Sequence, residues 1–236
     1  MYAAATGMAA QQQNLDVVAD NLANADVVGF KGAQASFAAI GGNAQLGTAA
    51  TGTHTVATQG KLMKSGGPFD VAIDGGGFFR VERDGTHAFT RAGAFARSAD
   101  GSLRNADGWR LTGVRVPAGT TSLSVDAAGR VTGDVGVHAR EGLGRIRLAG
   151  FDAPERLRPI GSAVFAATRE AGKPRDVRAG GDRESKIVFG VLEKSNVSIV
   201  ESMMEILAAQ RAYEANAKGV QAADEMLRIA NNLHRS

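Results

Sequence analysis

Both ends of the chain carry apolar or small side chains that recur every seven residues, and this repeat is the strongest constraint on the fold. Near the N-terminus it runs over residues 2–25, and near the C-terminus over residues 197–234. A repeat of this kind lines one side of a helix and marks that side for packing against another helix. The sequence therefore predicts a helix at each end, and we expect the two to pair as a coiled coil or helical bundle.

We expect subunit packing to be carried by the larger side chains of the two repeats, which are Met8, Leu15, Val18, Leu22, Ile199, Ile206, Tyr213, Val220 and Leu227. At 1.5 Å per residue the C-terminal helix would be roughly 55 Å long, which is more than a compact domain of this size needs. Either Ser195 or Asn196 can cap its first turn. The excess length favours packing between subunits, and an ordinary helix pair buried inside one chain is the alternative.

Between the two helices the period of the sequence changes from seven to two. Short segments between residues 69 and 151 alternate apolar with polar side chains, which is typical of β-strands. Asp-Gly pairs, such as Asp84–Gly85, separate several of these segments and favour tight hairpin turns. The predicted fold class is therefore α+β, with an antiparallel β-rich central domain flanked by N- and C-terminal heptad-like helices.

This pattern divides the chain into four parts. We expect an N-terminal helix over residues 1–30, an extended connector over 31–58, a β-rich domain over 59–190 and a long C-terminal helix over 191–236. The connector is inferred from composition, because it is rich in Gly, Ala and Thr and shows little periodicity.

The residues that carry enzyme or metal chemistry are missing or scattered. There is no cysteine, and the four histidines lie far apart in the sequence, so we expect no metal site. Three glycines at 75–77 precede a strand rather than the Lys-Ser/Thr of a phosphate loop, which favours a hairpin turn. Asp70 and Asp74 are the best candidates for an acid pair, but turn hydrogen bonding is the preferred interpretation. We therefore expect no catalytic, cofactor-binding or metal-ligating residue.

The charge of the chain argues against nucleic acid as a partner. Lys and Arg number 27 against 24 Asp and Glu, giving a formal net charge of +3, and the Arg residues are scattered. A nucleic-acid surface would gather them on one element, ideally beside stacking aromatic rings.

The first residues also lack the basic start and uninterrupted apolar stretch of a secretory signal peptide.

Four stretches of the sequence together resemble the flagellar rod and hook family. They are NLDVVADNLANADVVGFK (14–31), TQGKLMKSGGPFDVAIDGGGFFRV (58–81), RAGAFARSADGSLRNADGWRLTG (91–113) and the segment 190–233. They occur in the order found in the family, and the combination is more specific than any one motif. Within 190–233, residues 210–227 are most similar to the distal rod members, with the proximal rod members second.

The resemblance implies a structural subunit of the bacterial flagellar basal body, with the terminal helices forming an inner tube and the β-domain an outer layer. It implies export through the flagellar export apparatus without leader cleavage, polymerisation into the rod that crosses the periplasm, and transmission of torque from motor to hook. The implied partners are copies of the same chain, other rod and hook proteins and the export apparatus, with neither nucleic acid nor a small-molecule substrate.

Three alternatives stay open. Within the family, the chain could be a proximal rod or hook-type paralogue. From other classes, a β-rich binding or enzyme domain would predict a pocket with convergent polar groups, and a secreted adhesin is a further possibility.

Overall fold

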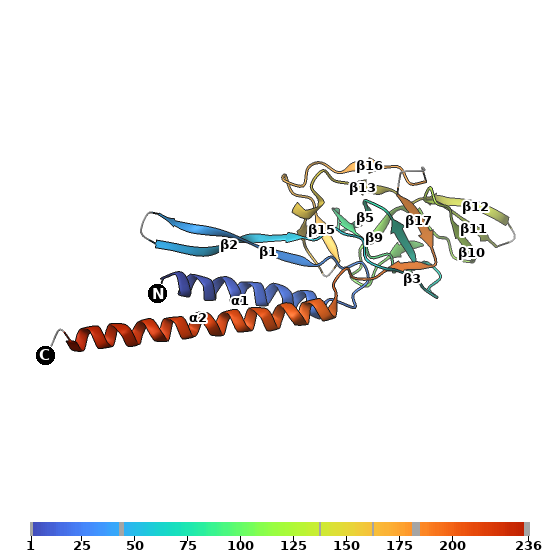
Figure 1. The fold of residues 1–236 in the computed structure, drawn as a ribbon. Helices are drawn as coiled ribbons and strands as arrows, with labels where there is room; N and C mark the ends of the chain where they lie inside the picture. Colours follow the sequence, from blue (N-terminus) through green and yellow to red (C-terminus); the bar gives the residue numbers. More distant parts are fainter. Residues whose placement is uncertain (1, 43–44, 137, 162, 181–184, 234–236) are drawn as a thin grey trace. The chain divides into compact units, whose positions relative to one another are not determined.

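The computed structural model describes residues 2–42, 45–136, 138–161, 163–180 and 185–233 (Figure 1). The chain folds into two units. Unit 1 combines residues 1–23, 33–54 and 197–236, and unit 2 combines residues 24–32 and 55–196. The chain therefore passes from one unit to the other four times.

Unit 1 consists of two helices and a two-stranded sheet. Helix α1 (Tyr2–Ala23) and the 35-residue helix α2 (Ile199–Leu233) lie side by side and run in opposite directions (Figure 1). Strands β1 (Ala33–Gly42) and β2 (Gln45–Thr55) form the sheet, and β1 packs against α1. The amide of Asn21 exchanges hydrogen bonds with the backbone of Ala33 and fixes the start of β1 beside the end of α1.

Specific residues mark the start of α2 and the turns that follow α1. Ser198 precedes α2, and its hydroxyl accepts a hydrogen bond from the backbone N–H of Glu201, so Ser198 is the capping residue rather than Ser195 or Asn196. Helix α1 stops at Ala23, short of residue 30, and turns follow. Gly29 lies in these turns with φ of 69°, and a Cβ there would come within 2.3 Å of the backbone nitrogen of Ala92. Only glycine fits this position.

The segment expected as an extended connector, residues 31–58, contains the hairpin β1–β2. Strand pairing uses backbone groups, so small Gly, Ala and Thr side chains can form strands without producing an alternating apolar pattern. The C-terminal segment also starts differently from the expectation, because strand β18 (Val191–Glu193) precedes α2 and pairs with β3 (Leu62–Lys64).

Unit 2 is built from short antiparallel strands. Besides β3 and β18, these are β4 (Val71–Asp74), β5 (Phe78–Arg83), β6 (Thr86–Thr90), β7 (Ala96–Arg97), β8 (Ser102–Arg104), β9 (Arg110–Arg115), β10 (Thr120–Val125), β11 (Arg130–Val135), β12 (His138–Arg145), β13 (Leu148–Gly150), β14 (Arg158–Pro159), β15 (Val164–Ala166), β16 (Arg175–Val177) and β17 (Lys186–Phe189), with a 3-10 turn η1 (Pro154–Arg156). The central antiparallel β-rich region and the two terminal helices are thus confirmed.

One large sheet organises unit 2. Its main path runs β10-β11-β12-β9-β5-β6-β15-β14, and β13 joins it by pairing with β5. Strands β4 and β17 form a separate two-stranded sheet, as do β3 and β18. The β5–β6 turn contains Asp84 and Gly85, both with positive φ, as a type I′ hairpin turn requires.

Strand β5 divides the core of unit 2 into two clusters. Phe79 is fully buried in the larger cluster, which includes Ile73 and Leu111. Its neighbour Phe78 points to the other face of the strand and packs edge-on against Phe151 in the second cluster. The adjacent phenylalanines therefore stabilise both faces of the sheet from one strand.

Candidate functional site

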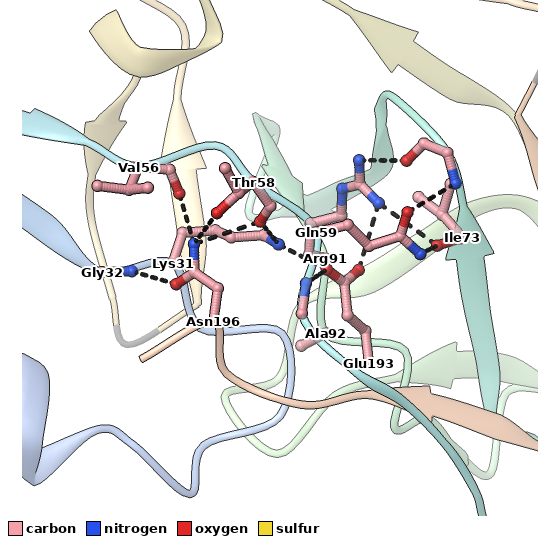
Figure 2. Close-up of polar contacts among 12 residues, drawn as sticks. Lys31, Gly32, Val56, Thr58, Gln59, Ile73, Arg91, Ala92, Glu193 and Asn196 are labelled. Atoms are coloured by element: carbon pink, nitrogen blue, oxygen red, sulfur yellow. Dashed lines mark hydrogen bonds and ion pairs between the residues drawn. The ribbon is translucent and has the colours of Figure 1, made fainter. Parts of the chain in front are cut away.

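A buried ionic cluster lies in unit 2 at the ends of the segments that lead to unit 1. We use this name for Lys31, Arg91 and Glu193 (Figure 2). The side chain of Glu193 is completely buried, and its carboxylate accepts hydrogen bonds from Lys31 Nζ at 2.5 Å, the backbone N–H of Gly60 at 2.8 Å and Arg91 Nη1 at 3.2 Å. These three donors come from three separate stretches of the chain.

A backbone hydrogen bond next to the ion pair holds Lys31 and Glu193 close together. The backbone N–H of Gly29 donates to the carbonyl of Glu193 at 2.7 Å, so the turn before Lys31 lies beside the end of β18. The Lys31 ammonium also donates to the carbonyl of Thr58 at 2.6 Å. Lys31 therefore joins the segment before β1 to the segment after β2.

Arg91 completes the cluster from the end of β6. Its Nη2 donates to the carbonyl of Gly75 at 2.7 Å, and its guanidinium lies 5.4 Å from the centre of the Phe78 ring. Its Nε has no hydrogen-bond partner among the described residues. Burial lowers the pKa of both Lys31 and Arg91, and the carboxylate of Glu193 offsets part of each shift. The cluster thus holds two cations and one carboxylate, so its geometry depends on Glu193.

Asn196 links three chain segments through one side-chain amide (Figure 2). Its Oδ1 accepts a hydrogen bond from Gly32 N–H at 2.8 Å. Its Nδ2 donates to the carbonyl of Val56 at 2.8 Å and to the carbonyl and hydroxyl of Thr58. Gly32 and Val56 are themselves joined by a backbone hydrogen bond of 2.7 Å. Asn196, which itself precedes α2, therefore holds together the segment of unit 2 that leads into β1 and the segment that follows β2.

Gln59 extends this network towards the sheets. Its amide donates to the carbonyl of Ile73 at 3.1 Å and accepts from Gly75 N–H at 3.0 Å, which spans the turn between β4 and β5. Donors and acceptors satisfy one another in these contacts. The arrangement is suited to holding backbone segments in a fixed register rather than to transforming a substrate.

The residues expected to pack subunits lie on α1 and α2 at different degrees of exposure. Val18 is buried, and half-buried positions are occupied by Met8, Leu15, Leu22, Ile206 and Val220. Ile199 and Tyr213 are exposed. The side chain of Leu227 lies outside the described residues. Among the α2 side chains that the structure describes, the most buried are small, Ser202 and Ala209.

Helix α2 also carries an exposed apolar stripe over its first two turns. It consists of Val200, Met203, Met204 and Leu207, each more than half exposed. Their spacing of three and four residues places them on one side of the helix. Their spacing is visible in the sequence, but their exposure depends on which side of α2 faces α1, and the sequence analysis did not predict this stripe.

The two aspartates considered as an acid pair have different environments. Asp70 is buried and accepts a hydrogen bond from the Ser65 hydroxyl, whereas Asp74 is exposed at the end of β4. Among the described residues no three His, Asp or Glu side chains gather as metal ligands would. No described helix is long and apolar enough to cross a membrane.

The residues that build the network were not predicted from the sequence. Lys31, Arg91, Glu193 and Asn196 belong to no periodic pattern, and the contacts among them are long-range. The available signal was the position of Lys31, a charged residue following the apolar run Val27–Val28–Gly29–Phe30.

Models of known protein families match three parts of the chain. They are described as flagella basal body rod protein over residues 1–31, flagellar hook protein FlgE/F/G D1 domain over 72–133, and flagellar basal body rod FlgEFG protein C-terminal over 190–233. The first and third include the residues of the network at positions 31, 193 and 196.

Whole-length relatives agree with these matches. The flagellar basal-body rod protein FlgG of Agrobacterium fabrum is 34% identical, with 97% of this chain and 96% of the relative covered. FlgG of Borreliella burgdorferi is also 34% identical, covering 100% and 98%. The rod protein FlgF of Mesorhizobium japonicum is 29% identical, covering 92% and 90%. The matched models and these relatives are described as rod or hook proteins and not as enzymes, and the chain belongs to the family of flagellar basal-body rod proteins.

Proposed function

We propose that this structural rod subunit polymerises through unit 1 into a helical tube that transmits torque from the flagellar motor to the hook. The observation that carries the proposal is the exposed apolar stripe of α2. Soluble monomers rarely display contiguous apolar surface of this kind, and such surface commonly marks a protein interface. Other rod and hook proteins are the expected neighbours at the two ends of the tube.

The energetics favour contact between copies through this stripe. Burying an average aliphatic side chain contributes roughly 1.5–3 kcal/mol. Four side chains at Val200, Met203, Met204 and Leu207 can therefore offset much of the entropy lost when one subunit is fixed against another. A head-to-tail contact that does not close on itself generates a helical polymer rather than a ring.

Within each subunit we propose that α1 and α2 pair in the manner of a coiled coil. Buried Val18 on α1 and buried Ala209 on α2 support this, and Gly7 of α1 approaches Asn216 of α2 so closely that a Cβ at Gly7 would lie 3.1 Å from its amide nitrogen. Small residues at such positions permit close approach of two helices. Ile199 and Tyr213 are exposed and are available for packing between copies.

We further propose that the subunit leaves the cell interior through the flagellar export apparatus without leader cleavage and assembles in the part of the rod that crosses the periplasm. Family membership supports this. Unit 2 would then form the outer layer of the tube and unit 1 its inner layer.

The test changes the stripe without disturbing the subunit. In the variant M203E/L207E two exposed apolar side chains become charged, which opposes their burial between copies. The control M63E/I160E adds the same charge at two exposed apolar positions of unit 2, away from the stripe. Purified full-length chains would be compared by analytical ultracentrifugation and electron microscopy, and in cells by restoration of swimming.

We expect the wild type and the control to assemble and to support swimming, and M203E/L207E to remain monomeric with an unchanged circular dichroism spectrum. Assembly of M203E/L207E at the same concentration as the control would show that the stripe does not carry subunit contacts.

A further inference from the structure

A second surface, on unit 2, has a chemistry that rod assembly through unit 1 does not use. Strand β5 changes its partner along one edge: β13 pairs with Phe78 and Phe79, and β9 pairs with Val81 and Glu82. Arg80 lies between these two pairings. A hollow of about 450 Å³ opens at this position.

At Arg80, a side-chain hydrogen bond takes the place of backbone pairing between strands. The hydroxyl of Thr112 in β9 donates to the carbonyl of Arg80 at 3.1 Å. Gly113 follows with a positive φ, and a Cβ there would come within 2.5 Å of the Arg145 carbonyl. The chain from β12 to β13 therefore runs close against β9 and carries Arg145 and Arg147 to the rim.

The rim is basic. Arg145 and Arg147 are exposed and flank Ile146, which is buried, so both point away from the core on the same side of the chain. Arg80 and His87 line the same hollow. We call this surface, defined by Arg80, His87, Arg145 and Arg147, the basic hollow.

The carboxylates at the hollow are already paired. Glu82 accepts a hydrogen bond from Arg110 at 3.2 Å. Asp176 Oδ1 lies 2.6 Å from Arg80 Nη2, and the buried Nε of Arg80 has no hydrogen-bond partner within the described ranges. Within the described parts of the chain no carboxylate pairs with Arg145 or Arg147. The hollow therefore carries an excess of positive charge and is complementary to an anion.

The floor of the hollow distinguishes among anionic ligands. Its apolar side chains are Phe89 and Pro174, whereas Val81 and Ala88 point to the opposite face of the sheet, into the larger core cluster. An apolar floor beneath a basic rim fits a ligand with an apolar group next to a carboxylate. A nucleic acid would need a longer basic track and exposed aromatic rings for stacking, and Phe89 is not exposed.

We propose that the basic hollow binds an acidic segment of a partner protein, with an apolar side chain of that segment over Phe89 and an adjacent carboxylate held by Arg145 and Arg147. Arginine suits this role because its guanidinium presents two parallel N–H groups to a carboxylate. The surface lies entirely within unit 2, so its occupation does not depend on the assembly of unit 1.

A fluorescent peptide of alternating Glu and Leu is the probe, and binding to the purified full-length chain is followed by fluorescence anisotropy. The same titration is repeated with a Gln-Leu peptide, a Glu-Ser peptide and a single-stranded oligonucleotide. The variant R145Q/R147Q removes the rim charges. The control R97Q/R158Q removes two charges from exposed arginines elsewhere on unit 2.

We expect R145Q/R147Q to weaken binding of the Glu-Leu peptide roughly tenfold or more, as loss of charge-assisted hydrogen bonds implies, and the control to bind as the wild type does. The Gln-Leu and Glu-Ser peptides should both bind less tightly than the Glu-Leu peptide. Thermal melts of both variants should match the wild type, because all four arginines are exposed.

The proposal fails if the wild type does not bind the Glu-Leu peptide, or if the two double variants lose affinity equally. Equal affinity for the Glu-Ser peptide would show that the apolar floor plays no part. Tighter binding of the oligonucleotide than of the peptide would replace an acidic protein segment with a nucleic acid.

Discussion

Lys31 Nζ lies 2.5 Å from Glu193 Oε1, although the two residues are 162 positions apart and both side chains are fully buried. An ion pair removed from water contributes little net stability, because the desolvation of both charges offsets their attraction. Loss of one partner has a much larger effect, since the other charge is left buried without compensation. The pair therefore contributes more to selecting one arrangement of the chain than to the free energy of unfolding.

Replacement of Glu193 by Gln should destabilise unit 2 strongly. Lys31 and Arg91 would both remain buried without a counter-charge, and breaking a buried pair typically costs about 3–5 kcal/mol. Urea unfolding followed by the fluorescence of Trp109, the chain's single tryptophan and a buried residue of unit 2, measures the change.

The matched control is Glu170→Gln, which removes the carboxylate of an exposed pair with Arg156. Such surface pairs contribute about 0–1 kcal/mol. Equal stability losses in the two variants would contradict the role assigned to Glu193.

Replacement of Asn196 by Ala should loosen a specific backbone amide. Gly32 N–H is bonded to Asn196 Oδ1, so its hydrogen exchange should accelerate, and leaving a buried donor without a partner costs about 1–3 kcal/mol. The control Asn105→Ala removes an equivalent bond to Trp109 N–H in another turn. Exchange at Gly32 should respond only to the first change and exchange at Trp109 only to the second; the same response at both amides in both variants would mean general destabilisation.

The titration of Lys31 predicts a pH dependence of stability with a definite sign. Burial lowers its pKa below the ordinary value of 10.5, and the ion pair with Glu193 offsets only part of this. Between the folded pKa and 10.5 the unfolded chain binds more protons, so the contribution of Lys31 to the free energy of unfolding rises with pH in that window.

The comparison of wild type with Lys31→Met isolates this contribution. The stability of the wild type relative to the variant should increase from pH 7 towards pH 10 in urea unfolding followed by Trp109 fluorescence, whereas Lys61→Met, at an exposed position, should show no such trend. A relative stability that falls with pH would mean that Glu193 outweighs burial at Lys31.

In unit 1, Val18 and Ala19 are neighbours with opposite environments. Val18 is 3% exposed on the buried side of α1, and Ala19 is exposed. Val18→Asp should destabilise unit 1 by at least about 2 kcal/mol, through the lost apolar burial and the introduced charge, while Ala19→Asp should have little effect. Urea unfolding followed by the helical circular dichroism signal measures the stability of each variant. Similar unfolding curves for the two variants would show that the Val18 side of α1 does not pack in unit 1.

The regular elements follow from periodicity because their causes are local. The alternation in residues 78–82 and the Asp84–Gly85 turn are sufficient to predict β5 and its hairpin. The hairpin β1–β2 could not be predicted in this way, because most of its side chains are small and its sequence shows no clear alternation of apolar and polar residues. The turn at Gly29, after the end of α1, also depends on a distant contact, the close approach of Gly29 to Ala92.

The network around Glu193 shows why the site is harder to predict than the fold. Nothing near Glu193 in the sequence distinguishes it from Glu201 eight residues later, yet one is fully buried and the other is exposed. The difference arises from which segments meet in space, and a single sequence carries no direct signal for contacts of that range. The apolar stripe at 200–207 is an intermediate case, since its spacing is local but its exposure depends on where α1 lies.

The position of Glu193 and Asn196 late in the chain has a consequence for the order of events during folding. Lys31 belongs to the part of the chain that is made first, and its counter-charge is made after almost all of unit 2. Until residue 196 is available, Gly32 and Val56 can form their own backbone hydrogen bond, but both lack their bonds to the Asn196 amide. The last strand of unit 2 and the residues after it thus supply contacts that the earlier segments cannot make before residues 193–196 are synthesised. Contacts between residues this far apart in sequence carry a larger loop-closure cost, which slows folding relative to a chain held together by local contacts.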